Sequence, residues 1–130
     1  MSGRPERAVF EYALLRIVPR AERGEQMNAG VVLYCRPRSF LATLVHLDEE
    51  RLRALDPSAD VAGVRAALGA FVCVSEGGAA AGQASGEEPG RRFRWLVAPR
   101  STVLRAGPVH LGLTVDPAAE VRRLLKTLVR

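Results

Sequence analysis

Apolar side chains recur with a period of two over the first third of the chain. Residues 9–18 carry apolar positions on both alternating faces, which is typical of a strand that is covered on much of both sides. Further strand-like runs occupy residues 27–35 and 40–47, and the four-residue link 36–39 between them has the length of a hairpin loop. These three sequential strands with short links predict an antiparallel meander.

After the predicted meander, apolar residues recur at the spacing of a helix. Asp48 is suited to cap a short helix over residues 49–55, and a second helix is expected to start near Ser58 or Asp60, with apolar positions at steps of three and four up to residue 72. At the end of the chain Asp116 precedes a proline, the residue favoured at the first helical position. Apolar residues then follow at helical spacing: Val121, Leu124, Leu125, Leu128 and Val129. We expect this terminal helix to dock on the sheet.

Residues 76–92 contain five glycines and three consecutive alanines, so this stretch predicts a flexible loop. Short strands are expected beyond it at 93–97, 102–105 and 109–114. The pattern as a whole predicts an α+β fold, with an antiparallel sheet of about five strands and two to three helices packed on one face. A length of 130 residues fits a single domain, 1–130.

The charge balance is basic, with a formal net charge of +5. Of the 19 basic residues only Lys126 is a lysine, which indicates a base-composition bias in the coding sequence. The arginines are scattered and form no basic block, so nucleic-acid binding is only weakly supported. No apolar stretch reaches the length of a membrane span and no apolar signal segment opens the chain, so we expect a cytoplasmic protein without membrane contact.

No motif predicts a metal site or a cofactor. The two cysteines, Cys35 and Cys73, belong to no CxxC or Cys/His cluster, and the histidines His46 and His110 have no metal-ligand spacing. Neither a phosphate-binding loop nor a dinucleotide fingerprint is present. Nothing in the composition decides whether the chain forms a homo-oligomer.

The first candidate site is the polar run 23–30, which enters the second strand. Arg23, Glu25 and Asn28, together with Arg16 on the neighbouring strand, supply donors for a phosphate or carboxylate ligand. The alternative is structural, because Glu25 can pair with an arginine and Asn28 can satisfy the turn. In the same run Gly24 suits a backbone turn with positive φ.

Gly30, inside the second strand, indicates a bulge or a close backbone approach.

Two further candidates lie near the end of the chain. Arg100 and Ser101 follow a proline and could bind an anion. The alternative is that these residues form an ordinary turn. Ser101 stands in no GxSxG elbow, so a serine hydrolase is poorly supported. His110 could act as a base or a phosphate contact, but a lone histidine among apolar neighbours is more often structural.

Residues 12–19, 25–35, 93–101 and 108–110, with the Asp116-Pro117 helix, resemble recurring segments of the bacterial domain of unknown function 3037 family. The resemblance implies a small bacterial protein without an established activity. It also implies an accessory role, since members of such families are encoded beside a HipA-like kinase. It supplies no catalytic residues.

Our leading hypothesis is a binding or accessory module for a protein partner rather than an enzyme, because catalytic motifs are missing. The alternative is an enzyme or binder that acts on a phosphorylated or nucleic-acid substrate, with Glu25 as base or metal ligand and with Arg16, Arg23 or Arg100 as anion clamps.

Overall fold

The computed structural model describes residues 6–77 and 88–130. The strands in this part of the chain are β1 (Ala8–Ile17), β2 (Met27–Cys35), β3 (Phe40–Val45), β4 (Leu104–Ala106) and β5 (His110–Thr114). The α-helices are α1 (Glu49–Leu55), α2 (Val61–Glu76), α3 (Pro89–Val97) and α4 (Pro117–Leu128). The predicted α+β fold with a five-stranded antiparallel sheet is confirmed, although the helices described number four instead of two to three.

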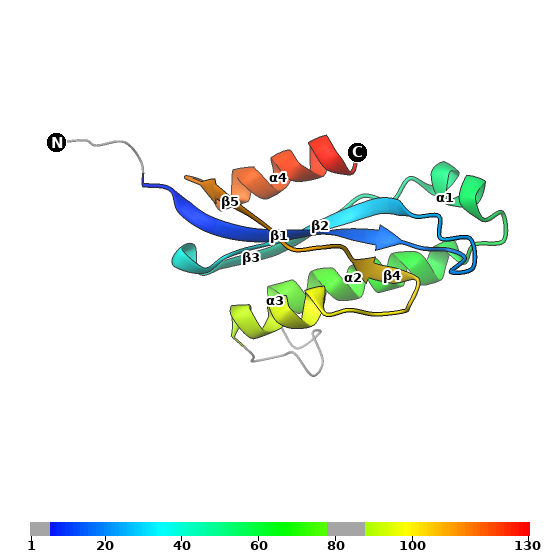
Figure 1. Cartoon of the computed structure of the whole chain (residues 1–130), viewed down its shortest axis with the longest axis horizontal. Helices are drawn as coiled ribbons and strands as arrows, with labels where there is room; N and C mark the ends of the chain where they lie inside the picture. Colours follow the sequence, from blue (N-terminus) through cyan, green and yellow to red (C-terminus); the bar gives the residue numbers. More distant parts are fainter. Residues whose placement is uncertain (1–5, 78–87) are drawn as a thin grey trace.

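The sheet has the order β3-β2-β1, and β4 and β5 share the remaining edge of β1. β4 pairs with the last residues of β1, from Leu15 onward, whereas β5 pairs with the first half, from Ala8 to Tyr12. All of these pairs are antiparallel. The meander predicted from the first three strands is therefore confirmed, and the chain returns to the sheet after the helices to complete its edge (Figure 1).

The β1–β2 pairing contains a bulge beside Gly30. Leu15 lies opposite Gly30, but the next residue of β1 lies opposite Asn28, so Ala29 is the extra residue. A Cβ atom added to Gly30 would lie 2.9 Å from the backbone oxygen of Leu44 on β3. Both features predicted for this glycine, a bulge and a close backbone approach, are therefore present.

Helices cover the sheet on both faces rather than on the single face that we expected (Figure 1). One buried cluster joins Leu15, Ile17 and Val32 of the sheet to α1, α2 and α3. A second cluster on the opposite face joins Phe10 and Leu33 to α4. The physical reason is the doubly apolar character of β1 and β2, which leaves two faces of the sheet to be buried.

The terminal helix docks as predicted, and its N-cap is Asp116. Val121, Leu124 and Val129 are buried, but Leu128 is 37% exposed and so faces away from the core.

α3 corrects the sequence prediction of a strand over residues 93–97. Pro89 occupies its first turn, where a missing N–H costs nothing, and the fully buried residues Phe93 and Leu96 lie three apart. Trp95, which the strand prediction placed on the same face as Phe93, is 46% exposed. Spacing by three, rather than by two, therefore describes the buried positions of this segment.

The helix starts and stops follow local sequence signals. Asp48, Asp60 and Asp116 each accept a hydrogen bond from the backbone N–H three residues further on, at 3.0–3.1 Å. α2 continues to Glu76 and ends at Gly77, whose φ is +74°. The loop predicted over 76–92 is thus partly helical at both ends, and residues 78–87 lie outside the described residues.

In the described part of the chain no helix combines the length and apolarity that crossing a bilayer demands.

Candidate functional site

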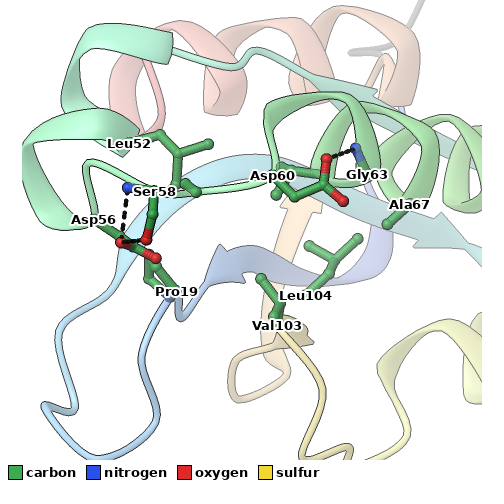
Figure 2. A pocket seen from close by; sticks show the side chains of 11 residues that line it. Pro19, Leu52, Asp56, Ser58, Asp60, Gly63, Ala67, Val103 and Leu104 are labelled. Atoms are coloured by element: carbon green, nitrogen blue, oxygen red, sulfur yellow. Dashed lines mark hydrogen bonds between the residues drawn. The ribbon is translucent and has the colours of Figure 1, made fainter.

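A pocket of about 420 Å³ opens where β1 ends. Its walls come from three distant parts of the sequence: Pro19 after β1, the α1–α2 link with the first turns of α2, and Val103 and Leu104 at the start of β4 (Figure 2). We call it the α1–α2 pocket. Its volume falls in the range of about 300–1,000 Å³ that is usual for binding pockets.

The floor of the α1–α2 pocket is apolar. Leu52, Val64 and Leu104 line it and belong to the buried core between the sheet and the helices. At the mouth Val103 is 45% exposed, so a ligand that entered would remove this side chain from water. A bound apolar group would therefore be stabilised by about 25 cal/mol for each Å² that it buries.

Two carboxylates stand on the rim above this floor. Oδ1 of Asp56 accepts hydrogen bonds from the backbone N–H and the hydroxyl of Ser58, at 3.1 and 2.9 Å. Oδ1 of Asp60 accepts from the backbone N–H of Gly63 at 3.0 Å (Figure 2). A Cβ atom on Gly63 would lie 2.3 Å from Oδ2 of Asp60, so any larger residue here would force this carboxylate to shift. Both acids are thus held in place by the backbone.

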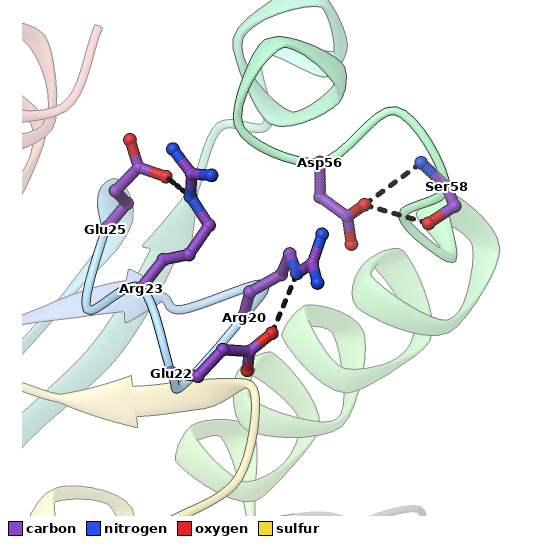
Figure 3. Close-up of polar contacts among 6 residues, drawn as sticks. All are labelled: Arg20, Glu22, Arg23, Glu25, Asp56 and Ser58. Atoms are coloured by element: carbon purple, nitrogen blue, oxygen red, sulfur yellow. Dashed lines mark hydrogen bonds and ion pairs between the residues drawn. The ribbon is translucent and has the colours of Figure 1, made fainter.

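The β1–β2 loop adds further charges beside the pocket. Arg20 Nε donates to Glu22 at 2.9 Å, and Figure 3 shows the Arg20 guanidinium on the side of the loop that faces Asp56. A hydrogen bond from its own backbone amide, and then the one from Arg20, lower the pKa of Glu22. The loop therefore adds the pair Arg20–Glu22 beside the two acids of the pocket rim, in a chain with a net charge of +5.

The residues predicted from the polar run 23–30 are occupied with internal contacts. Arg23 and Glu25 pair with each other at 2.5 Å, and this hydrogen bond raises the pKa of Arg23. Gly24 between them has φ +68°, as the predicted turn requires. Asn28 donates to the backbone oxygen of Leu128 on α4 at 3.1 Å. These contacts agree with the structural interpretation of the run.

Arg16 lies opposite Asn28 in the sheet, on the face that α4 covers. Its Nε atom is buried and has no hydrogen-bond partner among the described residues. Gly107 lies against its guanidinium, since a Cβ atom there would come within 2.8 Å of Cζ. Arg16 and Asn28 are thus neighbours, as predicted, but neither lines the α1–α2 pocket.

Arg100 folds back on the C-terminal end of α3. It donates to the backbone oxygens of Trp95, Leu96 and Ala98 at 2.6, 3.1 and 3.2 Å. Its guanidinium also lies 4.5 Å from the centre of the Trp95 ring and 5.1 Å from that of Phe71, and burial lowers its pKa. These contacts account for most of its donors.

Ser101 and His110 do not join Arg100 in one site. Ser101 is exposed directly after Arg100, whereas His110 is exposed on β5, with its ring centre 5.2 Å from that of Tyr12. Arg100 packs on the α2–α3 side of the sheet, and Asn28 contacts α4 on the other side. The seven predicted residues are therefore not gathered on one surface, and a ligand-binding role for any of them stays a prediction.

The sequence analysis did not identify the rim of the α1–α2 pocket. Its signal was the segment Asp56 to Asp60, in which two carboxylates stand four residues apart between α1 and α2. Asp60 was considered only as a helix start; in the structure it is the N-cap of α2, and Asp56 is the C-cap of α1.

A second, more open hollow of about 1,030 Å³ lies at the start of α3. Arg36, Arg91 and Arg94 line it, together with Glu11 and Glu88. Glu11 accepts hydrogen bonds from two nitrogens of Arg94, at 3.0 and 3.2 Å. Both signs of charge are therefore present, and part of the positive charge is already neutralised.

Within residues 6–77 and 88–130 no group of three or more histidine, cysteine or acidic side chains could hold a metal ion. Comparison with curated proteins and with solved structures found no match. A family model described as "Protein of unknown function (DUF3037)" matches residues 12–129.

Proposed function

Because the chain belongs to the DUF3037 family of proteins of unknown function, we propose its function from the α1–α2 pocket: a protein-binding module. In this proposal the pocket takes a short segment of a partner protein in which a basic residue neighbours an apolar one. The apolar side chain enters between Val64 and Val103, and the basic group lies against Asp56 and Asp60.

The observation that carries the proposal is the combination of an apolar floor with fixed carboxylates on the rim. A phosphate or a nucleic acid would be repelled there, whereas an ammonium or guanidinium group gains charge-assisted hydrogen bonds. The backbone already holds both acids, so little side-chain entropy is lost when a ligand binds.

The lining of the pocket also favours binding over catalysis. Its one hydroxyl, that of Ser58, donates to Asp56, and no histidine, cysteine or lysine is among the residues that line it in the described chain. Histidine is the commonest general base, and the described residues that line the pocket include none. A segment of a HipA-like kinase is a partner that the proposal accommodates if it carries the basic and apolar pair.

A peptide-display selection tests this function, followed by affinity measurement on the selected peptides. We expect peptides with Arg or Lys beside Leu, Ile, Met or Phe. Ala67 lines the pocket, and Ala66 on the same helix is exposed outside it, so Ala67→Phe and Ala66→Phe form a matched pair. Ala67→Phe should weaken binding at least tenfold, about 1.4 kcal/mol, and Ala66→Phe should not.

The charge requirement is tested by Asp60→Asn. Asparagine caps a helix about as well as aspartate, so the stability should be kept while the affinity for basic peptides falls several-fold. Selected peptides without a basic residue, or equal affinities for both phenylalanine variants, would count against the proposal.

A second candidate function is binding of a phosphorylated or nucleic-acid ligand, and the arginines of the hollow beside α3 favour it. Such binding should weaken steeply as salt is added, because phosphate contacts release counterions. Arg36→Gln should reduce it while leaving the selected peptides bound.

A further inference from the structure

β5 forms an edge of the sheet that natural proteins usually protect. In the described chain it pairs with β1 on one side only, so alternate backbone N–H and C=O groups on its other side point away from the sheet. Edge strands usually carry charges or proline against further pairing. Residues 109–115 carry neither, and the nearest charged residues are Arg105 and Asp116.

One face of this edge is apolar and open to water. Leu111 is 71% exposed and Leu113 is 59% exposed, and the pairing with β1 places Leu113 beside Val9, which is 47% exposed. Val109 and Val115, one residue beyond either end of β5, continue the same alternation at 39% and 47%. We call these five residues the β5 stripe.

Two of the charges beside the stripe, Glu11 and Arg94, neutralise each other, and Arg38 at its other end donates to the backbone oxygen of Val115 at 3.1 Å. Glu11 lies next to Leu111 in the register, and both of its carboxylate oxygens accept hydrogen bonds from Arg94. A partner that covered the stripe would therefore not have to bury an uncompensated charge at Glu11.

The sequence of the edge is symmetric about Gly112. Leu111 and Leu113 flank this glycine, and Val109 and Val115 stand at equal distances beyond them. On the opposite face the ring of Phe10 covers Gly112, since a Cβ atom there would lie 2.4 Å from its Cζ. A two-fold interface requires a surface that is complementary to itself, and this edge has that property.

We propose that two copies of the chain associate by antiparallel pairing of their β5 strands about a two-fold axis at Gly112. Leu111 of each copy then lies opposite Leu113 of the other, and Val109 lies opposite Val115. The two sheets join edge to edge, and the ten side chains of the two stripes collect on one face.

This association is independent of peptide binding. β5 pairs with the first half of β1, whereas the α1–α2 pocket lies beyond the last residue of β1. Both pockets of the dimer stay open, so either proposal can fail without the other.

Light scattering coupled to gel filtration tests the association. Loaded at about 100 µM, well above the Kd of about 10 µM of a weak interface, the protein should show twice the 14.1 kDa mass of one chain. Leu113→Lys should give the single-chain mass with an unchanged circular dichroism spectrum and unchanged peptide affinity. Val103→Lys, a matched exposed apolar residue outside the stripe, should remain a dimer. A single-chain mass for the unmodified protein, or a dimer that survives Leu113→Lys, would overturn the proposal.

Disulfide trapping tests the register. Opposed residues of an antiparallel pair have Cα atoms about 4.5–5.5 Å apart, which suits a disulfide. With Cys73→Ala as background and Cys35 buried, a mixture of Leu111→Cys and Leu113→Cys chains should cross-link several-fold faster than either alone. Equally fast cross-linking of Leu111→Cys alone would contradict the axis at Gly112.

Discussion

At the scale of single residues, two glycines of the fold contrast in what surrounds them. A Cβ atom on Gly30 would meet the backbone oxygen of Leu44, which cannot swing away, whereas Gly69 in α2 has no atom within 4 Å of the added carbon. We expect Gly30→Ala to lower the free energy of unfolding by about 1–3 kcal/mol. Gly69→Ala should raise it by about 0.5–1 kcal/mol. Urea denaturation measures both, and equal effects would show that the close approach at Gly30 is absent.

Glu22 offers a test of the charges beside the pocket. Because folding lowers its pKa, its ionised form favours the folded state above the pKa of the unfolded chain, and this contribution is lost as the pH falls through the folded pKa. Arg20→Gln removes one of the two hydrogen bonds responsible, so the pKa should rise part of the way to its ordinary value. NMR titration of the carboxyl carbon measures the shift, and an identical pKa in both proteins would contradict the Arg20 contact.

Among single residues, predictions from the sequence succeeded where the signal was local. Gly24 and the caps Asp48 and Asp116 act through neighbouring backbone, so their residue types alone indicate their geometry. Nothing in the sequence shows that Arg100 turns back on the carbonyl groups at the end of α3.

At the scale of elements, α4 shows how docking selects among apolar positions. Leu124 is 4% exposed against the sheet, and Leu128, one turn later, is 37% exposed. Leu124→Gln should cost about 2–4 kcal/mol, because it loses apolar burial and buries an amide without a partner. Leu128→Gln should cost less than about 1 kcal/mol. Thermal unfolding followed by circular dichroism compares them, and equal losses would show that α4 does not dock through Leu124.

α3 shows why the remaining elements could not be predicted with the same success. The segment 93–97 is rich in aromatic and branched residues, as a strand would be. Pro89 and the burial of Leu96 decide for a helix, and that burial depends on α2 and β2 lying beneath it. Tertiary packing, not local preference, therefore decides whether this segment forms a helix or a strand.

At the scale of the whole molecule, the apolar character of both faces of β1 was visible in the sequence, but the helices were expected on one face of the sheet and in fact cover both. The α1–α2 pocket could not be predicted from the sequence for a related reason. Pro19, the α1–α2 link and Val103 are far apart in the chain and meet only because β4 returns to pair with the end of β1. Long-range pairing of this kind leaves no periodic signal in the sequence.

The proposed function requires that a partner binds in the α1–α2 pocket. Titration of the ¹⁵N-labelled protein with a selected basic-apolar peptide, followed by two-dimensional NMR, tests this directly. We predict chemical-shift changes centred on Ser58, Gly63, Ala67 and Val103, and their loss in Ala67→Phe. Changes confined to the β5 stripe or to the hollow beside α3, with the pocket signals unmoved, would contradict it.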